Sequence, residues 1–187
     1  IGTPALLRAL PRRSVGCVGF VALDGLLRVP DFRAGERTWQ LLWAAAESVT
    51  PGGRLIIQTQ HPEHYAIRAM QAQDRASFYE EELKFRAELG YPPYRRLALV
   101  SVRGREDGPV RALAAECVAA LRGIGGLTVY PPASLTPPRG RNSRWRFVIK
   151  GPAELPRLLA PALEPFLGRR RRAGGMVEIE MDPQSNS

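Results

Sequence analysis

The first third of the chain alternates between the apolar spacing of strands and that of a helix. Residues 16–23 form a short apolar run that ends in an Asp-Gly pair, which predicts a buried strand followed by a turn. Residues 36–48 show helical spacing, and the Thr-Pro-Gly-Gly sequence at 50–53 is expected to end that helix. Residues 54–58 predict a second strand. A strand, a helix and a strand in this order predict a parallel α/β sheet.

Two helices are expected next, followed by a firm break in the pattern. The first is predicted to open at His61–His64, with Pro62 in its first turn. Asp74 is the expected N-cap of the second. The predicted apolar face of that second helix consists of Phe78, Leu83, Phe85 and Leu89. The sequence Gly-Tyr-Pro-Pro-Tyr at 90–94 ends the helix, and we place a domain boundary there.

The rest of the chain reads as strand, helix, strand, strand, helix and strand. The expected elements are strands at 96–102, 127–130, 144–150 and 176–181 and helices at 109–121 and 152–167. This βαββαβ order predicts a ferredoxin-like α+β arrangement, an antiparallel sheet of four strands with two helices on one face. We therefore divide the chain into an α/β part at residues 1–68, a helical linker at 69–94 and a C-terminal domain at 95–187.

Composition adds limits on the class of protein. Apolar residues make up 44% of the 187 residues, which is enough to bury a core, and no apolar run is long enough to cross a membrane. The two cysteines, Cys17 and Cys117, lie far apart in apolar surroundings, so we expect buried, reduced thiols and a cytoplasmic location. Because the chain begins at Ile1, we expect it to be part of a longer protein.

The net charge of +9 comes mostly from arginine. Of 27 basic residues, only Lys84 and Lys150 are lysine, which leaves 25 arginines. A GC-rich genome is one explanation, and a surface that binds a polyanion is another, since guanidinium groups match phosphate geometry. A sequence pI near 10.5 makes nucleic acid the leading candidate partner.

The best candidate for nucleic-acid binding is the basic segment at residues 139–150. It contains Arg139, Arg141, Arg144, Trp145, Arg146 and Lys150 and no acidic residue. In a strand, Arg144 and Arg146 would share one face and Trp145 would point to the other. We favour phosphate contact for the arginines and a core position for Trp145; base stacking by Trp145 and an ordinary solvated loop are the alternatives. A second basic run, Arg169–Arg172, is either a phosphate contact or a charged hairpin loop.

Other kinds of chemistry find little support in the sequence. His61 and His64 have a spacing that could bind a metal ion, but no further histidine or cysteine accompanies them. No nucleophile with a matching base and no glycine-rich phosphate loop is present in this span.

Several motifs resemble the PriA family of bacterial replication-restart DNA helicases, also called primosomal protein N′. The matching segments are Pro30–Leu42 with 55–64, the pattern D-x-x-x-F-x-x-x-E-L-x-x-R at 74–86 with Tyr91-Pro92-Pro93, and weaker matches at 139–146 and 181–183. The resemblance covers nearly the whole chain as the C-terminal half of such a protein. It implies the end of a RecA-like motor lobe at 1–68, binding of forked or single-stranded DNA, and partners such as single-stranded-DNA-binding protein and helicase-loading proteins.

The chain departs from this family at its motor motifs. Family members carry a run of the form QVAGRAGR where this chain has residues 43–53, which contain no arginine. The start, 2–10, aligns with a motif of the form GTQMLAKG but lacks its lysine and has Pro4 instead. Because phosphoryl transfer needs such cations at the developing charge, we expect no ATPase or helicase activity from this motor. The family uses ATP and magnesium, with structural zinc, in regions outside this span, so no cofactor is expected within it.

Some alternatives stay open at this point. Arg33 and Arg37 can still hold DNA or a lobe interface, or Arg37 can form a surface ion pair with Glu36. Arginines supplied elsewhere, for example Arg54, would make the protein an active ATP-dependent 3′-5′ helicase. A ferredoxin-like RNA-binding module is the alternative from another class. Glu154 stands near the place where the family has a basic residue for the acidic tail of single-stranded-DNA-binding protein, which argues against that contact.

Overall fold

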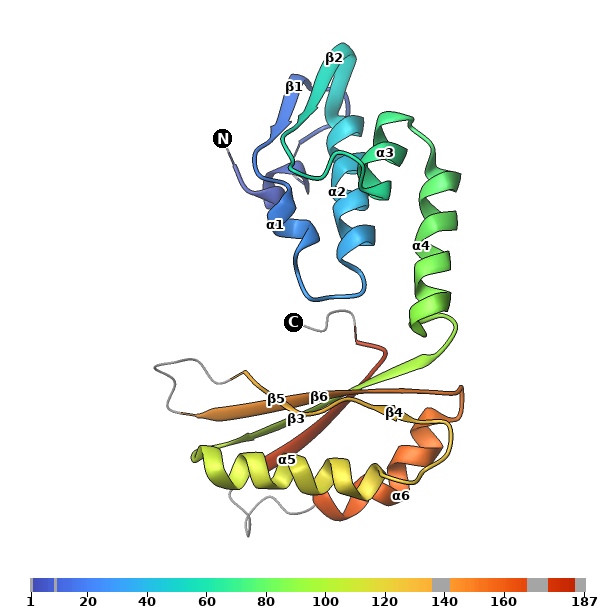
Figure 1. The fold of residues 1–187 in the computed structure, drawn as a ribbon. Helices are drawn as coiled ribbons and strands as arrows, with labels where there is room; N and C mark the ends of the chain where they lie inside the picture. The colour runs from blue at the N-terminus through green and yellow to red at the C-terminus, as the bar shows by residue number, and fades with distance from the viewer. Residues whose placement is uncertain (1, 9, 136–141, 168–174, 184–187) are drawn as a thin grey trace. The chain divides into compact units, whose positions relative to one another are not determined.

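The computed structural model describes residues 2–8, 10–135, 142–167 and 175–183. They divide into two compact units, one of which ends at Phe85 while the other begins at Arg86 (Figure 1). One unit contains a parallel sheet and the other an antiparallel sheet. The mixture of parallel α/β and antiparallel α+β structure predicted from the sequence is therefore present.

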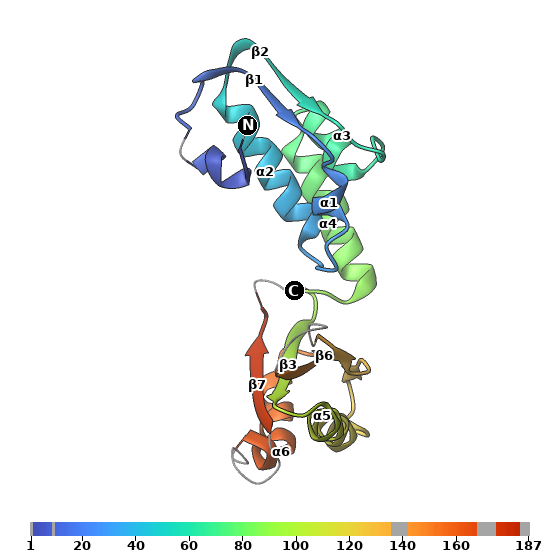
Figure 2. The ribbon, with the colours of Figure 1, turned by 90° about the vertical axis from the view of Figure 1, so that its left-hand side faces the viewer.

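The first unit is built on two parallel strands, β1 (Val15–Phe20) and β2 (Val49–Ile57). The long helix α2 (Ala34–Ser48) connects them, and a short helix α1 (Asp24–Leu27) and a 3₁₀ turn (Pro4–Arg8) precede it. Leu42 of α2 is completely buried and packs with Leu23, Ile67 and Met70. Figure 2 shows α2 running beside this strand pair.

The prediction of a buried first strand was wrong. Strand β1 is exposed at several positions, and Cys17, predicted to be buried, is exposed. The predicted turn at 50–53 instead belongs to β2, which begins directly after α2. Gly53 allows β2 to lie this close to β1. A Cβ atom at this position would lie 2.5 Å from the carbonyl oxygen of Gly16 on the neighbouring strand.

Helix α3 (Tyr65–Gln71) begins later than predicted. Its N-cap is His64, whose Nδ1 accepts a hydrogen bond from the backbone N–H of Ala66 at 3.2 Å. Pro62 therefore lies in the turn before the helix and not in its first turn. Burial lowers the pKa of His64, which favours the neutral ring that this cap requires.

Helix α4 (Arg75–Leu89) has the predicted N-cap but a different buried face. The carboxylate of Asp74 accepts a hydrogen bond from the N–H of Ser77 at 3.0 Å. Phe78 is buried and stacks on Trp39, and the next residue on that face is Glu82. The other three residues of the predicted apolar face, Leu83, Phe85 and Leu89, are exposed.

The second unit is an antiparallel sheet covered on one face by two helices (Figure 1). The strands are β3 (Arg96–Gly104), β4 (Thr128–Val129), β5 (Ala133–Ser134), β6 (Ser143–Gly151) and β7 (Gly175–Met181), and the helices are α5 (Asp107–Leu121) and α6 (Leu155–Leu167). The strand order is β4-β6-β3-β7, with β5 also paired to β6. The predicted element order is present, and β5 was not predicted.

The core of the second unit lies between the sheet and its helices. The buried residues of α5 are those predicted from its periodicity: Val110, Leu113, Ala114, Cys117 and Leu121. They pack against alternate residues of β3 and β6, such as Val100 and Phe147. Burial raises the pKa of the Cys117 thiol to about 11, so this residue behaves as a small apolar side chain.

Asp182 closes the end of the sheet at which β3 begins and β7 ends. Its carboxylate accepts a hydrogen bond from the N–H of Leu97 at 2.9 Å, and its own N–H donates to the carbonyl of Leu97 at 2.7 Å. Arg96 forms an ion pair with the same carboxylate. The weak sequence match at 181–183 therefore has a structural role in ending this strand pair.

Helix α4 crosses the division between the two units, and the predicted linker at 69–94 includes it. The proposed division into 1–68, 69–94 and 95–187 stays a prediction. Among the described residues, no helix is long and apolar enough to span a membrane.

Candidate nucleic-acid interface

The face of the antiparallel sheet away from its helices carries a cluster of arginines. Residues directly opposite each other in neighbouring strands point to the same side. Arg144 lies opposite Arg103, and Arg146 lies opposite Ser101. Their neighbours Trp145 and Val102 pack toward the helices. We call Arg103, Arg144 and Arg146 the arginine strip.

The charges of the arginine strip act on one another. Burial, followed by the charges of Arg144 and Arg103, lowers the pKa of Arg146, while Glu180 opposes the shift. The Nε of Arg146 donates to Ser101 Oγ at 3.3 Å. Like charges held this close favour binding of an anion, because a phosphate would relieve their repulsion.

Acidic residues limit where such an anion can lie. Glu178 on β7 forms an ion pair with Arg103 at 2.7 Å, and Glu180 lies on the same strand. The β7 side of the sheet therefore repels phosphate, whereas the β6 side attracts it. We expect a bound polyanion to follow β6 and the short strands beside it.

Trp145 occupies the opposite face of β6, as its position in the strand predicts. Its Nε1 donates to Asp107 Oδ1 at 2.9 Å, and the guanidinium of Arg111 lies over its ring. Ser143 Oγ donates to the same carboxylate oxygen at 2.6 Å. These hydrogen bonds, first that of Ser143 and then that of Trp145, lower the pKa of Asp107. Trp145 is half-buried and packs against the core of the second unit, and its contact with nucleic acid stays a prediction.

Lys150 is buried despite its charge. Its Nζ lies 3.4 Å from the ring centre of Tyr91 and 5.3 Å from that of Tyr130, and it donates to the carbonyl of Leu89 at 2.8 Å. This environment gives Lys150 a structural role. Its predicted contact with nucleic acid stays a prediction, and we leave it out of the proposed surface.

The remaining predicted arginines form two groups. Arg139 and Arg141, together with Arg169–Arg172, fall outside the described residues. Arg33 and Arg37 belong to the first unit, before and within α2. Among the described residues of the second unit, the structure therefore brings Arg144 and Arg146 together with Arg103.

Arg37 pairs with a different carboxylate from the one the sequence suggested. Its guanidinium lies 3.0 Å from Asp31, whose side chain is fully buried. Asp31 also accepts a hydrogen bond from the N–H of Arg33 at 2.9 Å. Glu36, the partner suggested by the sequence, accepts a hydrogen bond from the side-chain amide of Gln40. The buried Asp31 therefore orders the start of α2 through its contacts with Arg33 and Arg37.

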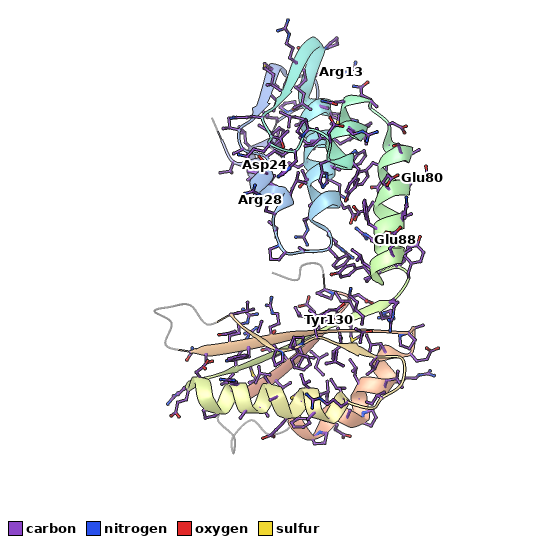
Figure 3. The ribbon with its side chains drawn as sticks, viewed as in Figure 1. Arg13, Asp24, Arg28, Glu80, Glu88 and Tyr130 are labelled. Atoms are coloured by element: carbon purple, nitrogen blue, oxygen red, sulfur yellow. The ribbon has the colours of Figure 1, made fainter. Side chains whose placement is uncertain are left out.

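Asp24 was missed in the sequence although it directly follows a predicted strand. Its carboxylate accepts hydrogen bonds from Thr59 Oγ1 at 2.7 Å and from the N–H of Gln60. The hydrogen bond from Thr59 is the main cause of the lowered pKa of Asp24. Arg28, labelled near Asp24 in Figure 3, donates to the side chain of Gln60. Asp24 thus ties together the chain segments that follow β1 and β2.

The histidine, cysteine and acidic side chains of the described residues are not clustered as a metal site requires. Among residues 2–8, 10–135, 142–167 and 175–183, no group of three or more histidine, cysteine or acidic side chains could hold a metal ion. His64 already uses its Nδ1 as a helix cap.

Comparisons with known proteins agree with these observations. The family model described as "Primosomal protein N C-terminal domain" matches residues 87–184. The replication restart protein PriA of Bacillus subtilis is 35% identical over 98% of this chain and 24% of its own length. That of Synechocystis is 32% identical over 82% of the chain and 19% of its own length. That of Thermotoga maritima is 38% identical over 56% of the chain and 14% of its own length.

The fold and basic surface fit a nucleic-acid-binding class of protein, and the sequence similarity is specific enough to name a family. This chain belongs to the PriA family. It spans no more than about a quarter of the length of these relatives. Among solved structures, the de novo designed protein Foldit4 matches 48% of the chain with 15% identity and a TM-score of 0.37, from which nothing is inferred.

Proposed function

We propose that this chain is the C-terminal part of a replication-restart protein and that its second unit binds DNA. Membership of the PriA family supports the process. The observation that carries the binding role is the arginine strip, in which three guanidinium groups gather on the sheet face away from the helices. Arg103 and Arg144 face each other across β3 and β6 in a position suited to successive phosphates.

The proposed ligand is forked or branched DNA, and the proposed outcome is reloading of the replicative helicase. The process for which the relatives are named, replication restart, is compatible with both. Proposed partners include single-stranded-DNA-binding protein and helicase-loading proteins. Glu154 is exposed at the position where a basic residue would meet an acidic tail, so that contact would require other cations. We place this activity in the cytoplasm at the nucleoid.

The fold supports a more specific description of the two units. Parallel strands β1 and β2 with α2 between them in sequence fit the end of a degenerate RecA-like lobe. The order βαββαβ with strands arranged β4-β6-β3-β7 fits a ferredoxin-like domain with β5 added. These assignments suit a protein in which the second unit contacts DNA and the first is a remnant of a motor.

We also propose that this motor has no ATPase or helicase activity. The segment at 43–53, which lacks arginine, forms the last turns of α2 and the start of β2. Glu47 in that segment forms an ion pair with Arg12. Arg54, the possible substitute, is exposed on β2 opposite Cys17. Transfer of a phosphoryl group needs a cation aimed at the transition state.

The experiment uses the full-length protein and compares two ligands at matched salt. Fluorescence titration of a DNA fork and of a structured RNA of equal phosphate number should give clearly tighter binding of the fork. The same preparation should show no fork-stimulated ATP turnover. Equal or tighter RNA binding would reject the restart role, and robust turnover that disappears in the Arg54→Ala variant would reject the inactive motor.

A further inference from the structure

An exposed tyrosine lies on the same face as the arginine strip. The N–H of Tyr130 donates to the carbonyl of Val148 at 2.9 Å, which extends the pairing of β4 with β6 by one residue. The preceding residue, Val129, packs toward the core, so Tyr130 points to the other face. Figure 3 places Tyr130 on the side of the sheet away from α5.

The ring of Tyr130 is both accessible and held in place. It is 40% exposed, and the ammonium group of Lys150 lies over the ring, 5.3 Å from its centre. The two prolines that follow restrict the backbone beyond it. A ring that is ordered before binding loses little conformational entropy when a flat ligand stacks on it.

The surroundings of Tyr130 combine aromatic, apolar and basic groups. Val148, opposite Tyr130, is two residues from Arg146 along β6, so their side chains share one face. On the neighbouring strand, Ala133 lies opposite Arg146. Leu135, whose N–H donates to the carbonyl of Arg144, is 43% exposed.

We propose that Tyr130 is a base-stacking residue that makes this face selective for unpaired nucleotides, with the arginine strip holding the adjoining phosphates. This inference rests on the proposed DNA-binding function. It specifies the part of the DNA that is recognised, an unpaired base. A base in a duplex already has both faces covered, so only an unpaired base can stack on the ring. The unpaired strand at a fork supplies such bases.

The position of the acidic residues agrees with this arrangement. Glu178 and Glu180 lie on β7, on the other side of β3 from β6. A strand that avoids them passes along β6 toward the edge formed by β4 and β5, where Tyr130 is found. Phosphate attraction and base stacking therefore point to the same edge of the sheet.

The test measures binding of three ligands to the full-length protein. They are a short oligothymidylate, a strand of the same length with abasic sugars, and a fully paired duplex. Tyr130→Leu should weaken binding of oligothymidylate about tenfold, which is the size of one base stack, and leave the other two ligands unchanged. Tyr130→Phe and Tyr130→Trp should retain binding. The salt dependence should not change, since stacking releases no counterions.

A control variant and a second readout keep the result interpretable. Tyr94→Leu removes a ring that is 54% exposed in the same unit and should leave all three affinities unchanged. Photocrosslinking of iodouridine-containing DNA to the unmodified protein should label Tyr130, whether or not the variant folds. Equal binding by wild type and Tyr130→Leu, equal losses on the abasic strand, or crosslinks that avoid Tyr130 would overturn the proposal. If wild type binds none of the ligands, the proposed function itself fails.

Discussion

At the scale of single residues, the family pattern on α4 has a structural explanation. Asp74, Phe78, Glu82 and Arg86 are four positions apart and so follow one face of the helix. Asp74 caps the helix, Phe78 stacks on Trp39 at 4.6 Å between ring centres, and Glu82 accepts a hydrogen bond from the Tyr65 hydroxyl at 2.5 Å. Arg86 donates to the carbonyl of Pro92. The pattern therefore specifies packing of this helix rather than a catalytic site.

Sequence patterns predicted only part of this face. The cap at Asp74 depends on local sequence and was predicted, as was burial of Phe78. Burial of Glu82 was not, because a carboxylate is expected in water unless a partner such as Tyr65 is known. Leu83 and Phe85 were predicted to be buried because apolar side chains are expected to avoid water. Both are exposed.

A pair of substitutions on α4 tests this assignment. Phe78→Ala should lower the free energy of unfolding by about 3–5 kcal/mol, because it removes a fully buried ring and leaves a cavity. Leu83→Ala, at a position 37% exposed, should cost less than about 1 kcal/mol. Urea denaturation followed by circular dichroism measures both. A larger cost for Leu83→Ala would mean that the predicted apolar face is the packed one.

At the scale of elements, the end of α4 and strand β6 are joined through Lys150. Its ammonium group donates to Leu89, in the last turn of α4, and lies over Tyr91, which follows the helix. Arg95 reinforces the connection by donating to the carbonyls of Gly126 and Lys150. Two short segments far apart in sequence are thus fixed to one strand. Sequence patterns could not reveal this, since Lys150 in a basic segment resembles a phosphate ligand.

The chain contains only two lysines, which makes their environments easy to compare. Lys84 is exposed on α4, and Lys150 is 4% exposed. Mild acetylation followed by mass spectrometry should modify Lys84 readily and Lys150 at least about tenfold more slowly, because its amine reacts only after local opening. In addition, Lys150→Met should destabilise the second unit by about 1–3 kcal/mol through loss of a charged hydrogen bond. Equal reaction rates would contradict the buried position.

At the scale of the whole molecule, the order of helices and strands could be predicted from the sequence more fully than the residues that share a surface. The parallel pair β1–β2 and, apart from β5, the succession from β3 to β7 follow from local periodicity. The arginine strip needed the register between β3 and β6, which places Arg103 opposite Arg144 and cannot be read from one strand alone. The available signal for Arg103 was the alternation of side chains along the strand predicted at 96–102. Extending that strand by one residue would have included Arg103. Exposure of Cys17 was missed because it depends on what covers a sheet face.

Family membership and surface chemistry lead to the same general function from different directions. The relatives are named for replication restart, and the second unit of this chain carries the arginine strip beside an accessible tyrosine. The segment in which the family carries motor arginines is occupied here by the end of a packed helix. Together these features support a protein that binds DNA through its sheet surface.

The most direct test of this account is the salt dependence of fork binding by a matched pair of double variants. In Arg144→Ala/Arg146→Ala, two cations of the arginine strip are removed; in Arg122→Ala/Arg157→Ala, two exposed cations from the C-terminal end of α5 and from α6 are removed, with the same change in net charge. The account predicts weaker binding for the first variant and a plot of log affinity against log salt that is shallower by about 1–2, with both quantities unchanged in the second. Identical slopes and affinities in the two variants would contradict it.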